Sequence, residues 1–144
     1  MDESLKLLEA AAAGDADAVL AALAAGASVN TRGEFGDTAL NLAAEHGHAG
    51  VVSALLGAGA DIENLGGADK TPLMNAAFAG HIPIVRQLLA RGARISDDLL
   101  SSLQMKVSIL EENAESGMVR PEAAEAWRNF LDGMIAERKK QDSA

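Results

Sequence analysis

The sequence predicts an all-α protein built from tandem helical repeats, and three observations support this. Hydrophobic residues make up 49% of the 144 residues, but aromatic residues make up only 3%. Such an excess of small apolar side chains suits closely packed helices, because sheets favour β-branched and aromatic residues. Second, the chain matches itself at an offset of 33 residues. Third, apolar residues recur within each copy at helical spacing.

The two best-matched copies begin at Thr38 and Thr71. The segment "TALNLAAEHGHAGVVSALLGAGADI" aligns with "TPLMNAAFAGHIPIVRQLLARGARI" without an insertion, and 12 positions are identical. A degenerate earlier copy falls into the same register through Leu7, Gly14 and Gly26. The sequence therefore predicts three repeats over residues 1–96, at about 4–36, 37–69 and 70–96.

Each copy is predicted to contain two short helices. In the last copy, the Thr71 hydroxyl can cap the first helix, and Pro72 occupies the first helical position, where proline is favoured. Gly80 ends that helix, and the second helix runs to Gly92 with an apolar face. Helices this short cannot bury their apolar faces alone, so we expect neighbouring copies to stack.

Residues 97–144 form a different segment, because the 33-residue periodicity stops after Ile95. One long amphipathic helix is predicted to begin at Ser96 and to end at Ser116-Gly117. A second begins at Pro121, and one of its faces carries Ala124, Trp127, either Phe130 or Leu131, and Met134. Since repeat arrays need an element that covers their last apolar face, we interpret 97–144 as a two-helix cap with a short basic and polar tail. The alternative is that its extra length forms a dimer interface.

The repeated residues closely resemble the ankyrin repeat. "TPLMNAAFAGH" with "VRQLLARGA", and "GDTALNLAAEHGH" with "VVSALLGAGADI", match its pattern at almost every framework position over about residues 4–96. The resemblance implies an ankyrin-repeat solenoid of stacked helix-turn-helix units with short hairpin loops, closed here by the C-terminal helical hairpin. It also implies recognition of a protein or peptide by the hairpin tips and the concave groove.

Several positions depart from the ankyrin pattern. Asn41 and Met74 replace a histidine that family members use for hydrogen bonding between repeats. Asp69 stands where the turn glycine is usual, and Gly33 and Gly66 stand where an aspartate is usual. We therefore expect the loss of that histidine bond, and hairpin loops that are looser or differently shaped.

The charge of the chain argues against two classes of partner. The net charge is −9, divided as −5 over residues 1–96 and −4 over residues 97–144. An acidic chain repels phosphate backbones and anionic lipid, so we expect neither nucleic acid nor a membrane as the main partner. The chain has no cysteine and begins with acidic residues rather than a basic signal region, which favours a cytoplasmic location.

The stretch "AAEHGHAG", residues 43–50, has the residue types of a metal site or an acid/base pair. However, His48 aligns with His81 at a framework position, so we interpret it as a structural hydrogen-bonding residue. A metal site needs three or four convergent ligands, and the sequence has neither a G-x-S-x-G motif nor a cysteine nucleophile. We therefore predict no metal, no cofactor and no enzymatic activity. Glu111, Glu112 and Glu115 are interpreted as a solvated helix face.

Two aromatic residues occupy positions that the repeat does not assign to the core. Phe35 is expected at a hairpin tip and Phe78 on the groove wall, and exposed aromatics are frequent interface anchors. The alternatives are that Phe35 packs under its own loop and that Phe78 shields the cap. With the variable positions around them, the candidate partner-binding residues are Arg32, Glu34, Phe35, Asp37, Glu45, His46, Lys70 and Phe78.

These observations predict a non-catalytic module that binds an unidentified protein or peptide through its hairpin tips and concave inner-helix groove. We expect a monomer. The alternative is a structural or assembly protein that uses the C-terminal helical hairpin to form homo-oligomers.

Overall fold

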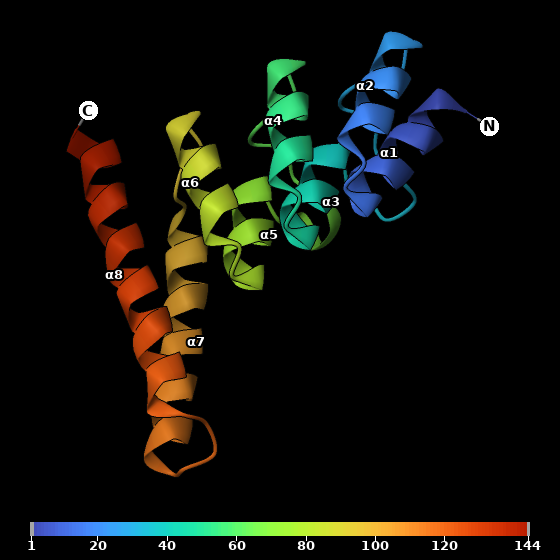
Figure 1. The fold of residues 1–144 in the computed structure, drawn as a ribbon. Coiled ribbons are helices and arrows are strands. Elements are labelled where there is room, and N and C mark those ends of the chain that lie inside the picture. The colour runs from blue at the N-terminus through green and yellow to red at the C-terminus, as the bar shows by residue number, and fades with distance from the viewer. Residues whose placement is uncertain (1, 144) are drawn as a thin grey trace. The chain divides into compact units, whose positions relative to one another are not determined.

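The computed structural model describes residues 2–143, and it confirms the all-α prediction (Figure 1). Within this range, the β-type pairing consists of one isolated antiparallel bridge between Arg32 and Thr38. In chain order the helical elements are α1 (Glu3–Ala13), α2 (Ala16–Ala24), α3 (Ala39–His46), α4 (Ala49–Gly57), the 3-10 turn η1 (Gly67–Asp69), α5 (Pro72–Ala79), α6 (Ile82–Ala90), α7 (Asp97–Glu115) and α8 (Pro121–Ser143).

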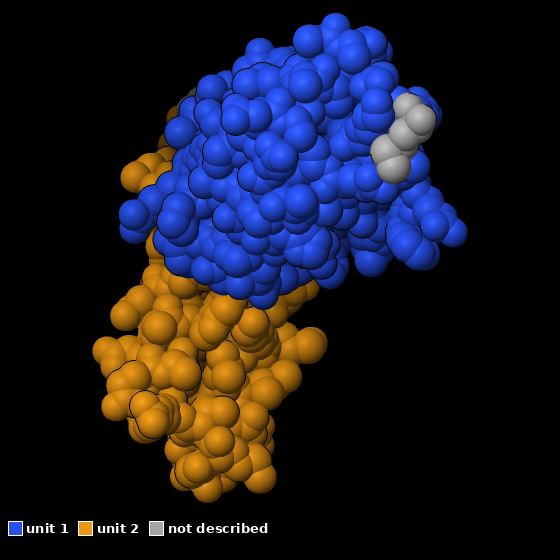
Figure 2. Space-filling model, turned by 45° about the vertical axis from the view of Figure 1, so that its right-hand side comes forward, with its two compact units in different colours: residues 1–93 blue, residues 94–144 orange. Residues whose placement is uncertain are grey.

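The chain divides into two compact units, residues 1–93 and 94–144 (Figure 2). Unit 1 contains three antiparallel helix pairs that follow one another in chain order (Figure 1). The first helices form one row, in which α1 contacts α3 and α3 contacts α5. The second helices form another row, α2, α4 and α6. Each pair therefore packs against the next, as the 33-residue period predicts.

The core of unit 1 repeats with the sequence. Leu7, Leu40 and Leu73 are buried in the first helices, at matching positions of the three pairs. Val19, Val52 and Val85 are buried in the second helices, again 33 residues apart. The stack of pairs thus buries faces that a single pair would leave in water.

The helix ends form as the sequence predicts. The Thr71 hydroxyl accepts a hydrogen bond from the Met74 amide at 3.2 Å, and Pro72 is the first residue of α5. Thr38 caps α3 through a capping box with Asn41. Gly47 and Gly80 end α3 and α5 in the left-handed conformation, in which glycine carries no steric cost.

His48 has the structural role that its repetition indicates. Its Nε2 lies 2.9 Å from the Ala12 carbonyl of the preceding pair, and His81 Nε2 lies 2.9 Å from the Glu45 carbonyl in the same way. The ring packs over Gly14, where an added Cβ would lie only 2.5 Å from His48 Nδ1. Each glycine therefore leaves the space that the next histidine fills.

Asn41 corrects one expectation from the sequence. We expected the missing histidine to remove a hydrogen bond between repeats, but Asn41 supplies bonds of this kind itself. Its Nδ2 donates to Asn75 Oδ1 at 2.9 Å and to the Lys70 carbonyl at 3.3 Å. Its Oδ1 accepts from the Thr38 amide at 3.1 Å. The side chain is fully buried, so these bonds compensate the loss of water.

Unit 2 consists of α7 and α8, which pack against each other. Ser96 caps α7 through the Leu99 amide, and Gly117 follows its end at a φ of 82°, as predicted. On α8 the structure decides between the two open positions, because Leu131 is buried and Phe130 is half-buried.

Glu111 adds an ion pair to the acidic face of α7, which remains solvated. Its two carboxylate oxygens accept hydrogen bonds from Arg128 of α8 at 2.9 and 2.8 Å. These bonds hold the pKa of the Glu111 carboxyl below its ordinary value of 4.5. They also raise the pKa of the Arg128 guanidinium. Glu112 and Glu115 are exposed, as expected.

Candidate protein-interaction site

Two loops of unit 1 are tied to each other by side chains. We call residues 31–38 hairpin 1 and residues 64–71 hairpin 2. The Arg32 guanidinium donates to the Gly36 carbonyl of its own hairpin at 2.8 Å and also to the Leu65 carbonyl of hairpin 2. Asp37 Oδ1 accepts from the Gly67 amide at 2.8 Å. The two hairpins are therefore held in register by a cation and a carboxylate.

Glycine at position 66 allows the hairpins to lie this close. A Cβ on Gly66 would collide with Asp37 Oδ1 and would lie 2.6 Å from Asn41 Oδ1. A Cβ on Gly67 would lie 3.0 Å from the Phe35 carbonyl. An aspartate, which is usual at position 66 in the ankyrin pattern, has no room here. The departures from the pattern therefore accompany hairpins that are bonded to each other, and of the two expectations for these loops the structure supports a different shape.

The two hairpin tips do differ in backbone conformation. Gly36 supplies a positive φ of 89° in hairpin 1. At the matching place in hairpin 2, Asp69 has a φ of 55°, and Ala68 before it has a φ of 58°. Aspartate tolerates this left-handed region better than most residues, but alanine has no side-chain group that compensates it.

Phe35 projects from this bonded loop into solvent. Its side chain is 81% exposed, which contradicts the alternative that it packs under its own loop. Leu65 of hairpin 2 is 51% exposed. Glu34 and Asp69, at the tips of the two hairpins, are also exposed. The tips thus combine apolar and acidic side chains on a backbone that hydrogen bonds hold in place.

Of the predicted site residues, Arg32 and Asp37 are already used within the protein. Their charged groups bond to the neighbouring hairpin, so they position the tips. Lys70 and Phe78 form a second pair, since Lys70 Nζ lies 5.5 Å from the centroid of the Phe78 ring. Phe78 is half-buried rather than free.

Glu45 and His46 lie apart from the hairpins. They are exposed at the last residues of α3, whereas hairpin 1 precedes the first residue of this eight-residue helix. The length of such a helix is about 12 Å. The His46 ring is near that of His48, with centroids 6.2 Å apart. The structure therefore does not bring these two residues to the same place as Phe35.

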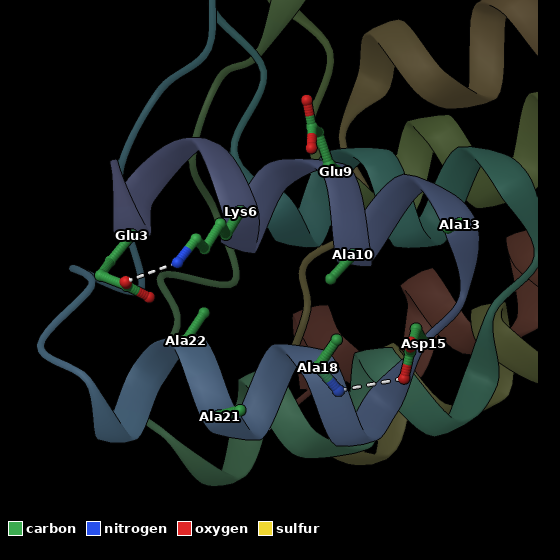
Figure 3. Close-up of a pocket in the computed structure, with 9 residues that line it drawn as sticks. All are labelled: Glu3, Lys6, Glu9, Ala10, Ala13, Asp15, Ala18, Ala21 and Ala22. Carbon is green, nitrogen blue, oxygen red and sulfur yellow. Dashed lines mark hydrogen bonds and ion pairs between the residues drawn. The ribbon is translucent and has the colours of Figure 1, made fainter. Parts of the chain in front are cut away.

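A shallow groove of about 470 Å³ lies elsewhere on unit 1, lined by α1 and α2. Figure 3 shows alanine side chains, including Ala10 and Ala22, between the two helices, with the Glu3–Lys6 ion pair at one end and Asp15 at the other. The matching surfaces of the later pairs are covered by the pair that precedes them.

This groove differs from the matching surfaces of the later pairs in having a charged rim and smaller apolar side chains. Lys6 is exposed, whereas the matching residues of the next pairs, Ala39 and Pro72, are buried. Ala22 likewise stands at the position that the larger Leu55 occupies in the second pair. A polar outer face is what the terminal surface of a repeat array requires. We therefore assign no ligand to the groove.

Comparison with known proteins agrees with this architecture. A family model described as ankyrin repeats matches residues 7–98, in three copies, and so covers more than half of the chain. The chain belongs to the ankyrin repeat family. A search of curated proteins gave no significant match to any individual protein.

Ankyrin repeats are generally protein–protein interaction modules and are typically not catalytic. Over residues 2–143 of this ankyrin protein, no group of three or more acidic or histidine side chains is arranged to hold a metal ion. None of the described helices combines the length and apolar character that crossing a bilayer requires.

Sequence reasoning missed two residues of the ankyrin hairpin tips, Leu65 and Asp69. Leu65 matches Arg32 in the repeat register, and Asp69 matches Gly36. A signal was present in each case, because a large apolar residue occupied a loop position and a carboxylate replaced the usual turn glycine. What the register could not show is that both side chains remain exposed.

Proposed function

We propose that this ankyrin protein is a non-catalytic interaction module. It binds a protein or peptide through the tips of hairpins 1 and 2 and through the surface of the first-helix row that adjoins them, with Lys70 and Phe78. The observation that carries the proposal is Phe35, whose side chain is 81% exposed on a loop held by hydrogen bonds. We keep Glu45 and His46 as a separate candidate contact at the other end of α3.

The energetics favour such a role for Phe35. Burying a phenylalanine side chain is worth about 1.5–3 kcal/mol, and in the free protein most of this gain is not realised. Ordering a flexible loop on binding costs about 1–2 kcal/mol per residue. Because Arg32 and Asp37 already hold the two hairpins, little of that cost remains for the partner to offset.

The test is a double variant, Phe35→Ala with Phe78→Ala. We expect a far-UV circular dichroism spectrum and a melting cooperativity close to wild type, with partner binding weakened by about 1–3 kcal/mol. Partners are found by affinity capture from native lysate with mass spectrometry. The wild type and the double variant are compared with Leu20→Ala, which removes a 52% exposed side chain from α2.

The informative proteins are those retained by the wild type and by Leu20→Ala but lost from the double variant. Calorimetry with such a protein then gives the change in affinity. If the double variant retains every protein that Leu20→Ala retains, the hairpin tips are not the binding surface and the proposal fails.

A second candidate function is homo-oligomerisation through unit 2. The observation that favours it is an open groove of about 620 Å³ between α7 and α8, lined by Leu100, Met105, Leu131 and Ile135, among others. Met105 is 67% exposed and Ile109, four residues further along α7, is 51% exposed. Sedimentation velocity over a concentration series separates the two candidates, because a strict monomer excludes the second.

A further inference from the structure

Each of the two hairpins carries one exposed apolar side chain. Phe35 comes from hairpin 1 and Leu65 from hairpin 2, and both side chains are more than half exposed. Arg32 joins the two loops, since its guanidinium donates to the Gly36 carbonyl, next to Phe35, and to the Leu65 carbonyl. The two apolar side chains therefore stand on one bonded framework rather than on two independent loops.

The charged side chains of hairpins 1 and 2 do not balance one another. The Arg32 guanidinium is bonded to backbone carbonyls, and the Lys70 ammonium lies over the Phe78 ring. The Asp37 carboxylate accepts from the Gly67 amide. Glu34 and Asp69 are different, because neither side chain forms a hydrogen bond or an ion pair with another described residue, and both are exposed. Arg32 and Lys70 keep their positive charges in these contacts, but with Asp37 the acidic side chains outnumber them three to two, so the two hairpins carry a net charge of −1.

We infer that the segment bound at the hairpin tips is a basic one that also carries apolar side chains. The inference rests on the proposed function and specifies the class of its partner. Phe35 and Leu65 bury apolar side chains of that segment, and Glu34 and Asp69 face its lysine or arginine side chains. The field of the whole unit acts in the same direction, because residues 1–93 carry 11 acidic and 5 basic side chains.

Neither the apolar side chains nor the carboxylates are sufficient alone. Exposed carboxylates attract any cation weakly, because an exposed ion pair contributes little binding energy in water. The apolar pair excludes water around the charges, and the charges select among apolar segments. An acidic segment of equal hydrophobicity is therefore rejected, and a basic segment without apolar residues binds weakly.

The experiment uses the full chain and three fluorescently labelled synthetic peptides of equal length. One is composed of leucine and lysine, one of leucine and glutamate, and one of serine and lysine. Fluorescence anisotropy gives the affinity for each. We expect the leucine–lysine peptide to bind at least about tenfold more tightly than either of the others.

Variants locate the contact. Phe35→Ala is expected to weaken binding of the leucine–lysine peptide about tenfold, and Glu34→Gln with Asp69→Asn to weaken it by about three- to tenfold. The matched control is Glu9→Gln with Asp17→Asn, which removes the same charge from two exposed positions on α1 and α2, outside the hairpins. It leaves the affinity within about twofold of wild type if the contact is local. An equal loss in both charge variants shows nonspecific attraction and overturns the inference.

The result also separates the inference from the proposed function. If the leucine–lysine peptide binds no better than the leucine–glutamate peptide, the inference is wrong, while the loss of captured proteins on Phe35→Ala with Phe78→Ala still supports the proposed function. If neither the captured proteins nor the peptide depends on Phe35, both are wrong.

Discussion

At the scale of single residues, Asn41 shows how one side chain can replace another of different shape. It is fully buried, and its amide group bonds to the start of its own helix and to the next repeat. A buried amide is stable only when its donors and acceptors are satisfied. Here the Lys70 carbonyl and Asn75 meet this condition, so Asn41 contributes to the link between the second and third repeats, beside the bond of His81 to the Glu45 carbonyl.

Asn41→Ala is expected to destabilise the protein by about 2–3 kcal/mol. The change removes one half of the capping box, so the buried Thr38 amide loses its acceptor, and it leaves Asn75 Oδ1 without this donor. Urea unfolding measures the effect. Asn129→Ala, at an exposed position of α8, is the control and is expected to change stability by less than about 0.5 kcal/mol. Equal midpoints for the two variants would show that the Asn41 bonds contribute nothing net.

The left-handed backbone at Ala68 gives a second prediction at this scale. Placing an alanine at a φ of 58° costs about 1–2 kcal/mol, and glycine removes this cost. Glycine also lowers the free energy of the unfolded chain by about 0.4–1 kcal/mol through its greater conformational entropy. We therefore expect Ala68→Gly to stabilise the folded protein by about 0.5–1 kcal/mol net. Gly36→Ala, at a φ of 89°, is expected to destabilise by about 1 kcal/mol. Midpoints that move in the same direction in guanidinium unfolding contradict this account.

At the scale of helices, a bidentate ion pair joins α7 to α8. Arg128 and Glu111 are 17 positions apart, and their planar groups meet through two hydrogen bonds. This geometry fixes the rotation of one helix against the other better than a single charge contact does. Because the pair is solvent-exposed, its contribution to stability depends on pH and salt.

The pH dependence of this pair follows from the lowered pKa of Glu111. Between the folded pKa and the ordinary value of 4.5, the unfolded chain binds more protons, so stability rises with pH in that interval. The contribution is complete above about pH 4.5 and is lost as the pH falls through the folded pKa. We expect wild type to melt at a higher temperature than Glu111→Gln at neutral pH, and this difference to disappear in acid.

The matched control is Glu112→Gln, which removes a neighbouring carboxylate that is exposed and has no arginine partner. Its melting temperature is expected to follow that of wild type across the same pH range. If both variants lose the same stability at the same pH, general charge repulsion rather than the ion pair is responsible.

Helix positions were predictable from sequence because their causes are local. Thr71, Pro72 and Gly80 start and stop α5 through groups a few residues away. Two ties between side chains were not predictable. Glu111 and Arg128 lie 17 residues apart in the segment without repeats. Arg32 and Leu65 hold matching positions of neighbouring repeats, 33 residues apart, but the repeat register does not show where a side chain points. For the same reason Arg32 looked like a free contact residue. The repeat register places Arg32 on a loop, but only the structure shows which atoms accept hydrogen bonds from its guanidinium group.

At the scale of the whole molecule, the relation between the two units can be tested with one intrinsic probe. Trp127 is the single tryptophan of the chain and lies in unit 2. Lys106 Nζ is 3.8 Å from the centroid of its ring, and the Phe130 ring packs edge-on at 5.7 Å. Its fluorescence therefore reports the unfolding of unit 2, whereas far-UV circular dichroism reports the helices of both units.

If residues 97–144 cap the repeats, the two signals are expected to change together in one urea transition, because the cap and the last repeat then stabilise each other. Leu73→Ala, a core substitution in unit 1, is expected to move both signals to lower urea. Separate transitions, or a fluorescence midpoint that Leu73→Ala leaves unchanged, would mean that unit 2 folds independently and has another role.

The contact between each glycine and the next histidine has a consequence for how the array can be lengthened. Gly14 accommodates His48, and Gly47 accommodates His81, with the same spacing. A duplicated copy of residues 38–70, inserted after residue 70, would bring a histidine to Gly47 and offer its own glycine to His81. The contact between glycine and histidine would then be complete at both junctions. Asn41 would face Leu42 of the copy in place of Asn75, so Leu42→Asn in the copy would be needed to keep that bond. An insertion that breaks the 33-residue period separates each glycine from its histidine.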